Sequence, residues 1–129
     1  MKMKKITITL FALIVGLCLV TSAFAANKGA IKKQVDKIVA AIDGGKTAQD
    51  FKNAAHNKPH YVFIMEENGM LLVHPSLAGQ SLKEKAKPAY DECVKATADG
   101  VWVSYEWKGK KKNTYVRKTK SGLIVGSGY

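Results

Sequence analysis

The stretch that decides the fold is Gly100–Tyr129, which reads GVWVSYEWKGKKKNTYVRKTKSGLIVGSGY. Near its start, β-branched and aromatic side chains occupy every second position: Val101, Val103, Tyr105 and Trp107. Such alternation predicts a β-strand with two unequal faces. The polar, glycine-containing run 108–112 predicts a hairpin turn, and a second strand follows at about 113–118. After a turn at 120–122, Leu123 begins a third strand. The stretch therefore predicts a three-stranded antiparallel meander.

A second pair of strands is predicted upstream. Residues 61–65, YVFIM, are apolar at both parities, which favours a central strand buried on both faces. Asn68-Gly69 is a strong hairpin signal. The return strand covers 70–74 and ends at Pro75, which cannot donate to the ladder.

Three helical segments complete the pattern. The first, about 28–42, has an apolar stripe at spacings of four, three and four residues: Ile31, Val35, Ile38 and Ile42. Asp43-Gly44-Gly45 ends it. A short second helix follows Thr47, which with Asp50 resembles a capping box. A third lies within 82–98, mostly after Pro88, with Cys93 buried on its inner face.

This order of elements predicts an α+β fold. We expect one five-stranded antiparallel sheet, with an N-terminal helix and with the helices packed on one side of the sheet. The helical segment 26–58 and the sheet segment 59–129 together form one domain, since so short a chain holds only one modest core.

The chain opens with the parts of a secretory signal peptide. A lysine-rich start precedes an apolar run from Ile6 to about Val20, and Ala23-Phe24-Ala25 fits a cleavage site. We expect a signal peptide at 1–25 and a periplasmic protein. Removal of its three lysines lowers the formal charge from +11 to +8. Outside the cytosol, this charge favours small organic anions or membrane headgroups as partners, and no nucleic acid. A lysine-rich surface that only keeps the protein soluble is the alternative.

Several segments in order resemble a known family. They are YVFIMEENGMLLVHP, then G-V-x-V-x-Y-x-W after a helix, then K-x-x-Y-V-R at 112–117 and a closing G-S-G-Y. This set, over roughly 61–129, resembles the single Cache domain, an extracytoplasmic ligand-sensing module. The resemblance implies a PAS-like antiparallel sheet, a small pocket on one face under a loop-and-helix cover, and small organic acids or other metabolites as ligands.

Six residues are candidates for ligand binding: His74, Tyr105, Trp107, Lys112, Tyr115 and Arg117. A carboxylate site needs a cation or hydrogen-bond donors among apolar walls. His74 ends a strand, Lys112 matches the lysine of the family's K-x-x-Y motif, and Arg117 is the chain's one arginine. Structural alternatives stay open. His74 can bond to backbone, the rings of Tyr105 and Trp107 can be core, and Lys112 and Arg117 can be solvated.

The sequence therefore predicts an exported, freestanding Cache-like domain that binds a small anionic metabolite without catalysis. A membrane receptor or transporter would then recognise the ligand-bound protein. We expect no cofactor. We also expect no metal site, because Pro59 lies between His56 and His60 and breaks the helix that would place them on one face. The alternative is an interaction protein of the same fold, whose basic hairpin 108–112 binds an acidic surface or anionic lipid. Membrane association would then need that surface or an uncleaved signal.

Overall fold

The computed structural model describes residues 27–129, so the predicted signal peptide lies outside the described part. The chain divides into two units, Met1–Ala30 and Ile31–Tyr129. Only 27–30 of the first unit are described, and they are helical. Within 27–129, no helix combines the length and the apolar character needed to cross a membrane.

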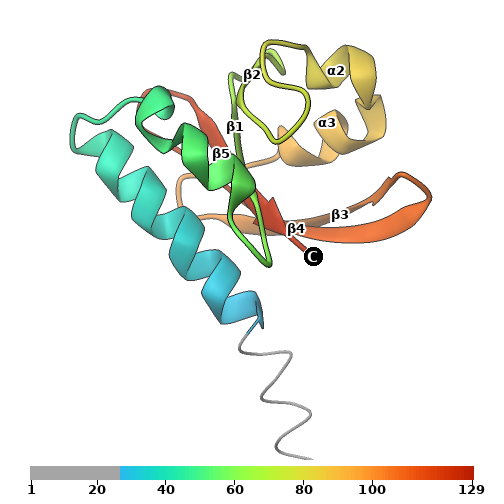
Figure 1. The fold of residues 1–129 in the computed structure, drawn as a ribbon, viewed down its shortest axis with the longest axis horizontal. Helices are drawn as coiled ribbons and strands as arrows, with labels where there is room; N and C mark the ends of the chain where they lie inside the picture. The colour runs from blue at the N-terminus through green and yellow to red at the C-terminus, as the bar shows by residue number, and fades with distance from the viewer. Residues whose placement is uncertain (1–26) are drawn as a thin grey trace, which may run out of the picture. The chain divides into compact units, whose positions relative to one another are not determined.

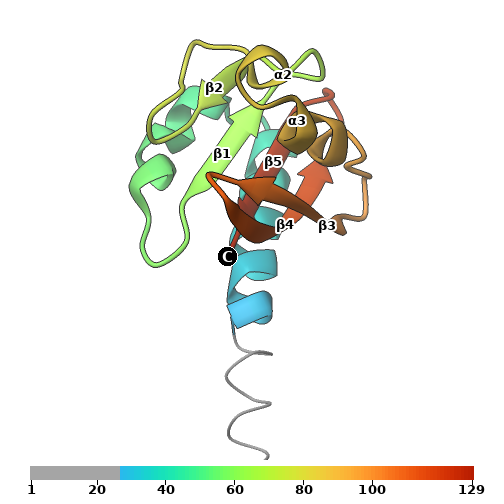
Figure 2. The same cartoon turned by 90° about the vertical axis from the view of Figure 1, so that its right-hand side faces the viewer.

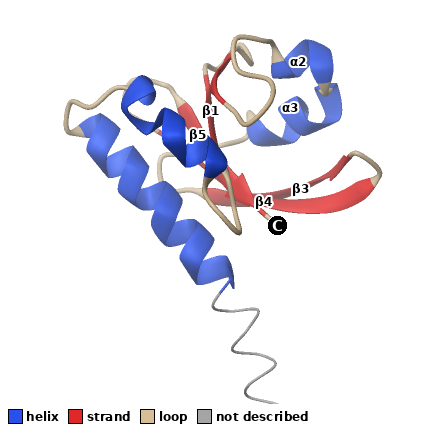
Figure 3. Cartoon of the chain, in the orientation of Figure 1, coloured by secondary structure: helices blue, strands red, loops and turns tan. Residues whose placement is uncertain are grey.

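Five strands form one antiparallel sheet (Figures 1 and 3). The strands lie side by side in the order β2-β1-β5-β4-β3. Their bounds are β1 Val62–Met65, β2 Leu71–Val73, β3 Val101–Trp107, β4 Lys110–Lys118 and β5 Ile124–Gly128. The predicted α+β class and five-stranded antiparallel sheet are confirmed. The C-terminal meander supplies β3, β4 and β5, and the upstream hairpin adds β1 beside β5.

The β3–β4 hairpin is tighter than the sequence suggested. Its turn is only Lys108-Gly109, with Trp107 paired to Lys110. Both turn residues have positive φ, 51° and 79°, as in the type I′ turn, whose twist matches that of the flanking strands. The run 108–112 is therefore not all turn, because Lys111 and residue 112 pair with β3. This difference decides which face the side chain at 112 occupies.

Helices cover both faces of the sheet, and the prediction that they pack on one side is wrong. The first face packs against residues 31–43 of the N-terminal helix, which ends at residue 43, and against the 3-10 helix η1 (Ala48–His56). The second face packs against α2 (Leu82–Lys85) and α3 (Lys87–Cys93). Figure 1 shows the two helical layers on opposite sides of β1 and β5. We call these the helix face and the pocket face.

Strand β1 shows why both faces need cover. Val62 and Ile64 point to the helix face, and Phe63 and Met65 to the pocket face, all at most 5% exposed. Burying side chains of this size contributes about 1.5–3 kcal/mol each. A strand apolar at both parities therefore gains from a helical layer on each side. The apolar character at both parities, which identified the strand, already contained this information.

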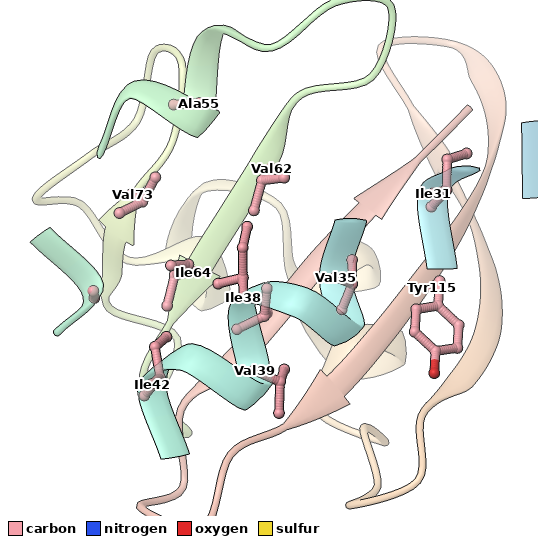
Figure 4. Close-up of a cluster of buried hydrophobic side chains, with 12 residues drawn as sticks. Ile31, Val35, Ile38, Val39, Ile42, Ala55, Val62, Ile64, Val73 and Tyr115 are labelled. Atoms are coloured by element: carbon pink, nitrogen blue, oxygen red, sulfur yellow. The ribbon is translucent and has the colours of Figure 1, made fainter. Parts of the chain in front are cut away.

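The helix-face core confirms the predicted apolar stripe. Ile31, Val35, Ile38 and Ile42 are at most 8% exposed and pack on β1 and β5 (Figure 4). The capping prediction is also confirmed in part: the Thr47 N–H donates to Asp50 Oδ2 at 2.9 Å at the start of η1.

Candidate functional site

A small cavity lies on the pocket face, between the sheet and the α2–α3 layer. Its walls come from β1, β2, β3 and both short helices: Tyr61, Phe63, Leu71, His74, Leu82, Ala89, Tyr105 and Trp107. The internal space is about 10 Å³, room for about one water molecule. Three of the predicted ligand residues, His74, Tyr105 and Trp107, line it together.

His74 is held by its own turn. Its Nδ1 accepts hydrogen bonds from the N–H groups of Ser76 and Leu77, at 3.0 and 2.9 Å. Because Nδ1 accepts, the neutral ring carries its proton on Nε2. Burial, with smaller contributions from Lys108 and Lys112, lowers the pKa of His74 to about 4. The imidazole is therefore neutral at pH 7. His74 therefore has both predicted roles. Its Nδ1 bonds to backbone N–H groups, and its ring lines the cavity.

Tyr105 lies beside the cavity and is partly buried. Its hydroxyl accepts a hydrogen bond from Thr114 Oγ1 at 2.9 Å, and burial raises its pKa above the ordinary value. The neighbouring Cys93 is fully buried, and burial raises the pKa of this thiol to about 12. A buried, protonated thiol is a poor nucleophile. This part of the wall is accordingly suited to packing and hydrogen bonding, as the sequence predicted for Cys93.

Lys112 lies beside the cavity as a half-buried cation. Its Nζ donates to the Tyr61 hydroxyl at 3.3 Å and lies 4.3 Å from the centre of that ring. Burial lowers its pKa from the ordinary value. Five ion pairs join described residues, and none of them includes Lys112. The cation is thus partly dehydrated, and within residues 27–129 its ammonium has a hydrogen bond to a phenol and no ion pair.

Tyr115 and Arg117 lie on the opposite, helix face. The Tyr115 hydroxyl donates to Asp36 Oδ1 at 3.0 Å, and Arg117 Nη1 pairs with the same oxygen at 3.0 Å. Arg117 Nε also donates to the Ala98 carbonyl at 2.7 Å. The structure therefore does not bring these two residues to the cavity. They tie Asp36 on the N-terminal helix to the sheet.

The strand β4 explains the division. Successive side chains alternate between faces, so Lys112 and Thr114 share one face, and Tyr115 and Arg117 have the odd parity of the other. The sequence interpretation began this strand at about Asn113 and left Lys112 in the turn, which hid the alternation. Continuing the strand by three residues would have separated the two groups.

Several cavity residues were not singled out from the sequence. Tyr61, which immediately precedes β1, has the parity of Phe63, and Leu82 and Ala89 come from the short helices. Phe63 pairs with Gly126 across the strands, and a Cβ at that glycine would lie 2.3 Å from the Phe63 Cζ atom. The ring therefore lies over the glycine and forms the cavity floor. The parity of residues 61–65 could have indicated Tyr61 and Phe63, but no pattern in the sequence indicated Leu82 and Ala89.

The sequence pattern around His74 did not show a bulge in β2. Strict alternation along β2 would make Leu71 and His74 face opposite sides, yet both line the cavity. The pairing of β1 with β2 jumps from Ile64–Val73 to Met65–Leu71, which leaves Leu72 as an extra residue. This irregularity shifts the parity. A sequence cannot show such a bulge.

Residues 27–129 contain no group of three or more histidine, cysteine or acidic side chains placed to hold a metal ion.

Comparisons with known proteins agree with this fold. A family profile described as Cache domain matches residues 22–129. Among solved structures, the chain resembles the crystal structure of a methyl-accepting chemotaxis protein from Vibrio parahaemolyticus RIMD 2210633. The identity is 14%, the match covers 84% of this chain and 91% of that chain, and the TM-score is 0.54. A second similar structure is the ligand binding domain of Mlp24 with asparagine, at 13% identity, with 64% and 35% covered and a TM-score of 0.44. No curated protein sequence matches the chain.

Proposed function

The chain belongs to the Cache domain family, and from this premise we propose that it is a sensory-type domain that binds a small organic acid or similar metabolite on its pocket face, without catalysis. The binding would be reversible capture, and a membrane receptor or transporter would detect the occupied protein. Cache domains are ligand-sensing domains. The ligand class assigned here is our own inference.

The single observation that carries the ligand class is Lys112. A half-buried ammonium has lost part of its hydration, and a phenol returns only part of that free energy. A ligand carboxylate placed beside Tyr61 would supply the missing negative charge in a charge-assisted hydrogen bond. A neutral ligand could accept a hydrogen bond from this lysine but would bring no opposite charge, and a cationic ligand would be repelled.

The cavity walls suit the rest of such a ligand. His74 offers a neutral Nε2–H donor whose ring position is fixed by two backbone hydrogen bonds. Tyr105 adds a hydroxyl, and Trp107 and Phe63 add apolar area. A few fixed polar groups among apolar walls are the usual composition of a small-molecule site.

Binding must enlarge the cavity, because about 10 Å³ holds no organic acid. The cover consists of two short helices of four and seven residues. Such short helices gain little stability from their own hydrogen bonds. We therefore propose that the α2–α3 layer shifts away from the sheet when the ligand enters.

We propose further that the protein works in the periplasm after cleavage of a signal peptide at 1–25. The support is the sequence pattern of the first 25 residues. Under this proposal, residues 26–58 and 59–129 make up the exported domain.

A thermal-shift screen tests the function. The panel contains small carboxylates, their uncharged amides and small amines, since a ligand that binds only the folded state raises the melting temperature. We expect a shift with a carboxylate and none with its amide. Lys112→Gln should reduce the affinity about tenfold, and Lys111→Gln, an exposed neighbour on the other face, serves as the matched control. Absence of any shift across the panel, or equal shifts in both variants, contradicts the proposal.

A further inference from the structure

A second concave site lies next to the cavity, on the outer side of Trp107. It is a groove of about 320 Å³ between the tip of the β3–β4 hairpin and the segment from the end of β2 to α2. Its lining residues are Ser76, Leu77, Lys85, Ala86, Glu106, Trp107 and Lys108. In Figure 2 the hairpin tip points toward the viewer, below α2 and α3. Trp107 lines both spaces and so forms the wall between them.

The floor and the sides of this groove differ in character. Trp107, Leu77 and Ala86 are apolar and only partly buried, so the groove exposes apolar area. Lys85 and Lys108 are exposed and come from different elements, α2 and the hairpin turn. Lys108 is fixed in the left-handed region by the turn, and its Nζ lies 6.0 Å from the centre of the Trp107 ring.

The charge of the groove is not compensated by ion pairs. Elsewhere in the described chain, Lys32, Lys87, Lys95 and Lys118 each pair with a carboxylate. No such ion pair includes Lys85 or Lys108. Glu106 also lines the groove, but it lies directly across the strands from Lys111. The lysines thus outnumber the one acid that lines the site.

We propose that this groove binds an organic anion with a flat apolar body, such as an aromatic carboxylate. The ring would stack on the exposed part of the Trp107 indole, and the carboxylate would lie between Lys85 and Lys108. The site is separate from the cavity and does not depend on the function proposed for it.

The shape of the site favours a small molecule over a membrane surface. The volume is within the range of small-molecule sites, about 300–1,000 Å³. The apolar residues lie inside a recess, whereas insertion into a bilayer requires protruding apolar side chains. Glu106 within the recess would also repel an extended anionic surface while leaving room for a single carboxylate beside the two lysines.

Calorimetry and NMR with 1-naphthoate, and with uncharged 1-naphthalenemethanol as its control, test the proposal on the purified protein. We expect naphthoate to bind, to shift the Trp107 indole N–H resonance more than that of Trp102, and to bind more weakly as salt rises. The uncharged alcohol should bind about tenfold more weakly. Equal binding of the two, or a resonance change spread evenly over the surface, would overturn the inference.

Charge-matched variants locate the site. Lys85→Gln/Lys108→Gln should weaken naphthoate binding about tenfold or more. Lys33→Gln/Lys37→Gln removes the same charge from the exposed side of the N-terminal helix and should leave it unchanged. Glu106→Gln should strengthen binding about twofold. If both double variants weaken binding equally, only net charge matters and the groove is not a site.

Two further results separate this inference from others. Lys112→Gln should leave naphthoate binding unchanged, so a failure here and a failure of the cavity ligand are distinguishable. Binding to vesicles with anionic lipid, lost on Lys110→Glu/Lys111→Glu, combined with no binding of naphthoate, would reject the groove and support a membrane-binding hairpin instead.

Discussion

His74 uses one ring nitrogen for structure and keeps the other as a donor at the cavity. The N–H groups of Ser76 and Leu77 hold Nδ1, so the tautomer is fixed. The ring would have to lose these bonds to carry a proton on Nδ1. The pKa of about 4 follows mainly from burial. A neutral donor is thereby maintained across the physiological range.

The low pKa of His74 predicts a loss of stability in acid. The unfolded chain takes up a proton near pH 6.5 and the folded chain only near pH 4. The stabilisation is therefore complete above pH 6.5 and is lost as the pH falls from 6.5 to 4. With allowance for solvent screening, we expect about 2 kcal/mol from this residue.

Urea unfolding at pH 7 and pH 4.5 measures that difference. In His74→Asn the amide oxygen can replace Nδ1 as acceptor, but nothing titrates, so the free energy of unfolding should fall less with acid than in the unchanged protein. His56→Gln, at an exposed position, controls for the loss of a histidine. An identical acid dependence in all three proteins would rule out the assignment.

Arg117 and Lys112 should differ in what they control. Arg117→Gln removes the ion pair to Asp36 at 3.0 Å and the bond to the Ala98 carbonyl. We expect a loss of about 1–3 kcal/mol in the free energy of unfolding. Affinity for a carboxylate found in the screen should change less than about twofold, because Arg117 is on the helix face. Lys112→Gln should instead reduce the affinity for the carboxylate and change the free energy of unfolding little. Denaturation and calorimetry on both variants decide this, and a large loss of affinity in Arg117→Gln would return Arg117 to the site.

At the scale of elements, the β3–β4 turn has a lysine at a position where the backbone conformation favours Asn or Gly. A type I′ turn favours Asn or Gly at its first central position, where φ is positive. The chain has Lys108 there, at φ 51°. Residues other than Gly and Asn adopt this conformation at a cost. A lysine at this position, next to Trp107, is consistent with a role in binding.

Lys108→Asn tests whether the lysine costs stability in the turn and contributes to binding in the groove. We expect the variant to stabilise the protein by about 0.5 kcal/mol, because Asn tolerates positive φ better. The same change should weaken naphthoate binding, since one of the two groove lysines is lost. Thermal unfolding and calorimetry on one sample measure both effects. Gly109→Ala, at φ 79°, is the contrast and should destabilise by about 1 kcal/mol. A destabilised Lys108→Asn would contradict the turn assignment.

At the scale of the whole sheet unit, two apolar cores share one central layer. Ile38 belongs to the helix-face core and Ile124 to the pocket-face core. The two residues are 6% and 0% exposed. The two residues belong to clusters on opposite faces of the sheet. Yet neither core can be lost without exposing one face of every internal strand.

This arrangement predicts additive effects within one cooperative transition. Ile38→Val and Ile124→Val should each cost about 1 kcal/mol, and the double variant about 2 kcal/mol. Fluorescence and circular dichroism should report the same midpoint in every case. Separate midpoints would contradict a single cooperative transition. A coupling energy above about 0.5 kcal/mol would contradict the independence of the two cores.

Sequence periodicity predicted most of the fold because it reflects local geometry. The alternation from Val101 to Trp107 and the Asn68-Gly69 turn identified the two hairpins, and the stripe from Ile31 to Ile42 identified the buried side of the first helix. The ordered motifs identified the family. Two parts differ from the prediction. The helices cover both faces, as the apolar character of residues 61–65 at both parities already indicated, and the β3–β4 turn is shorter than the predicted run 108–112.

The sequence by itself determined that there are five strands and that two hairpins join them, and it selected His74, Tyr105, Trp107 and Lys112 as candidates. Only the tertiary structure decided which candidates meet. The bulge at Leu72 put His74 on the cavity side, and the exact start of β4 separated Lys112 from Arg117. It also decided that the cavity is about 10 Å³. The physical reason is that pairing register and the packing of side chains from distant segments leave no periodic trace in the chain.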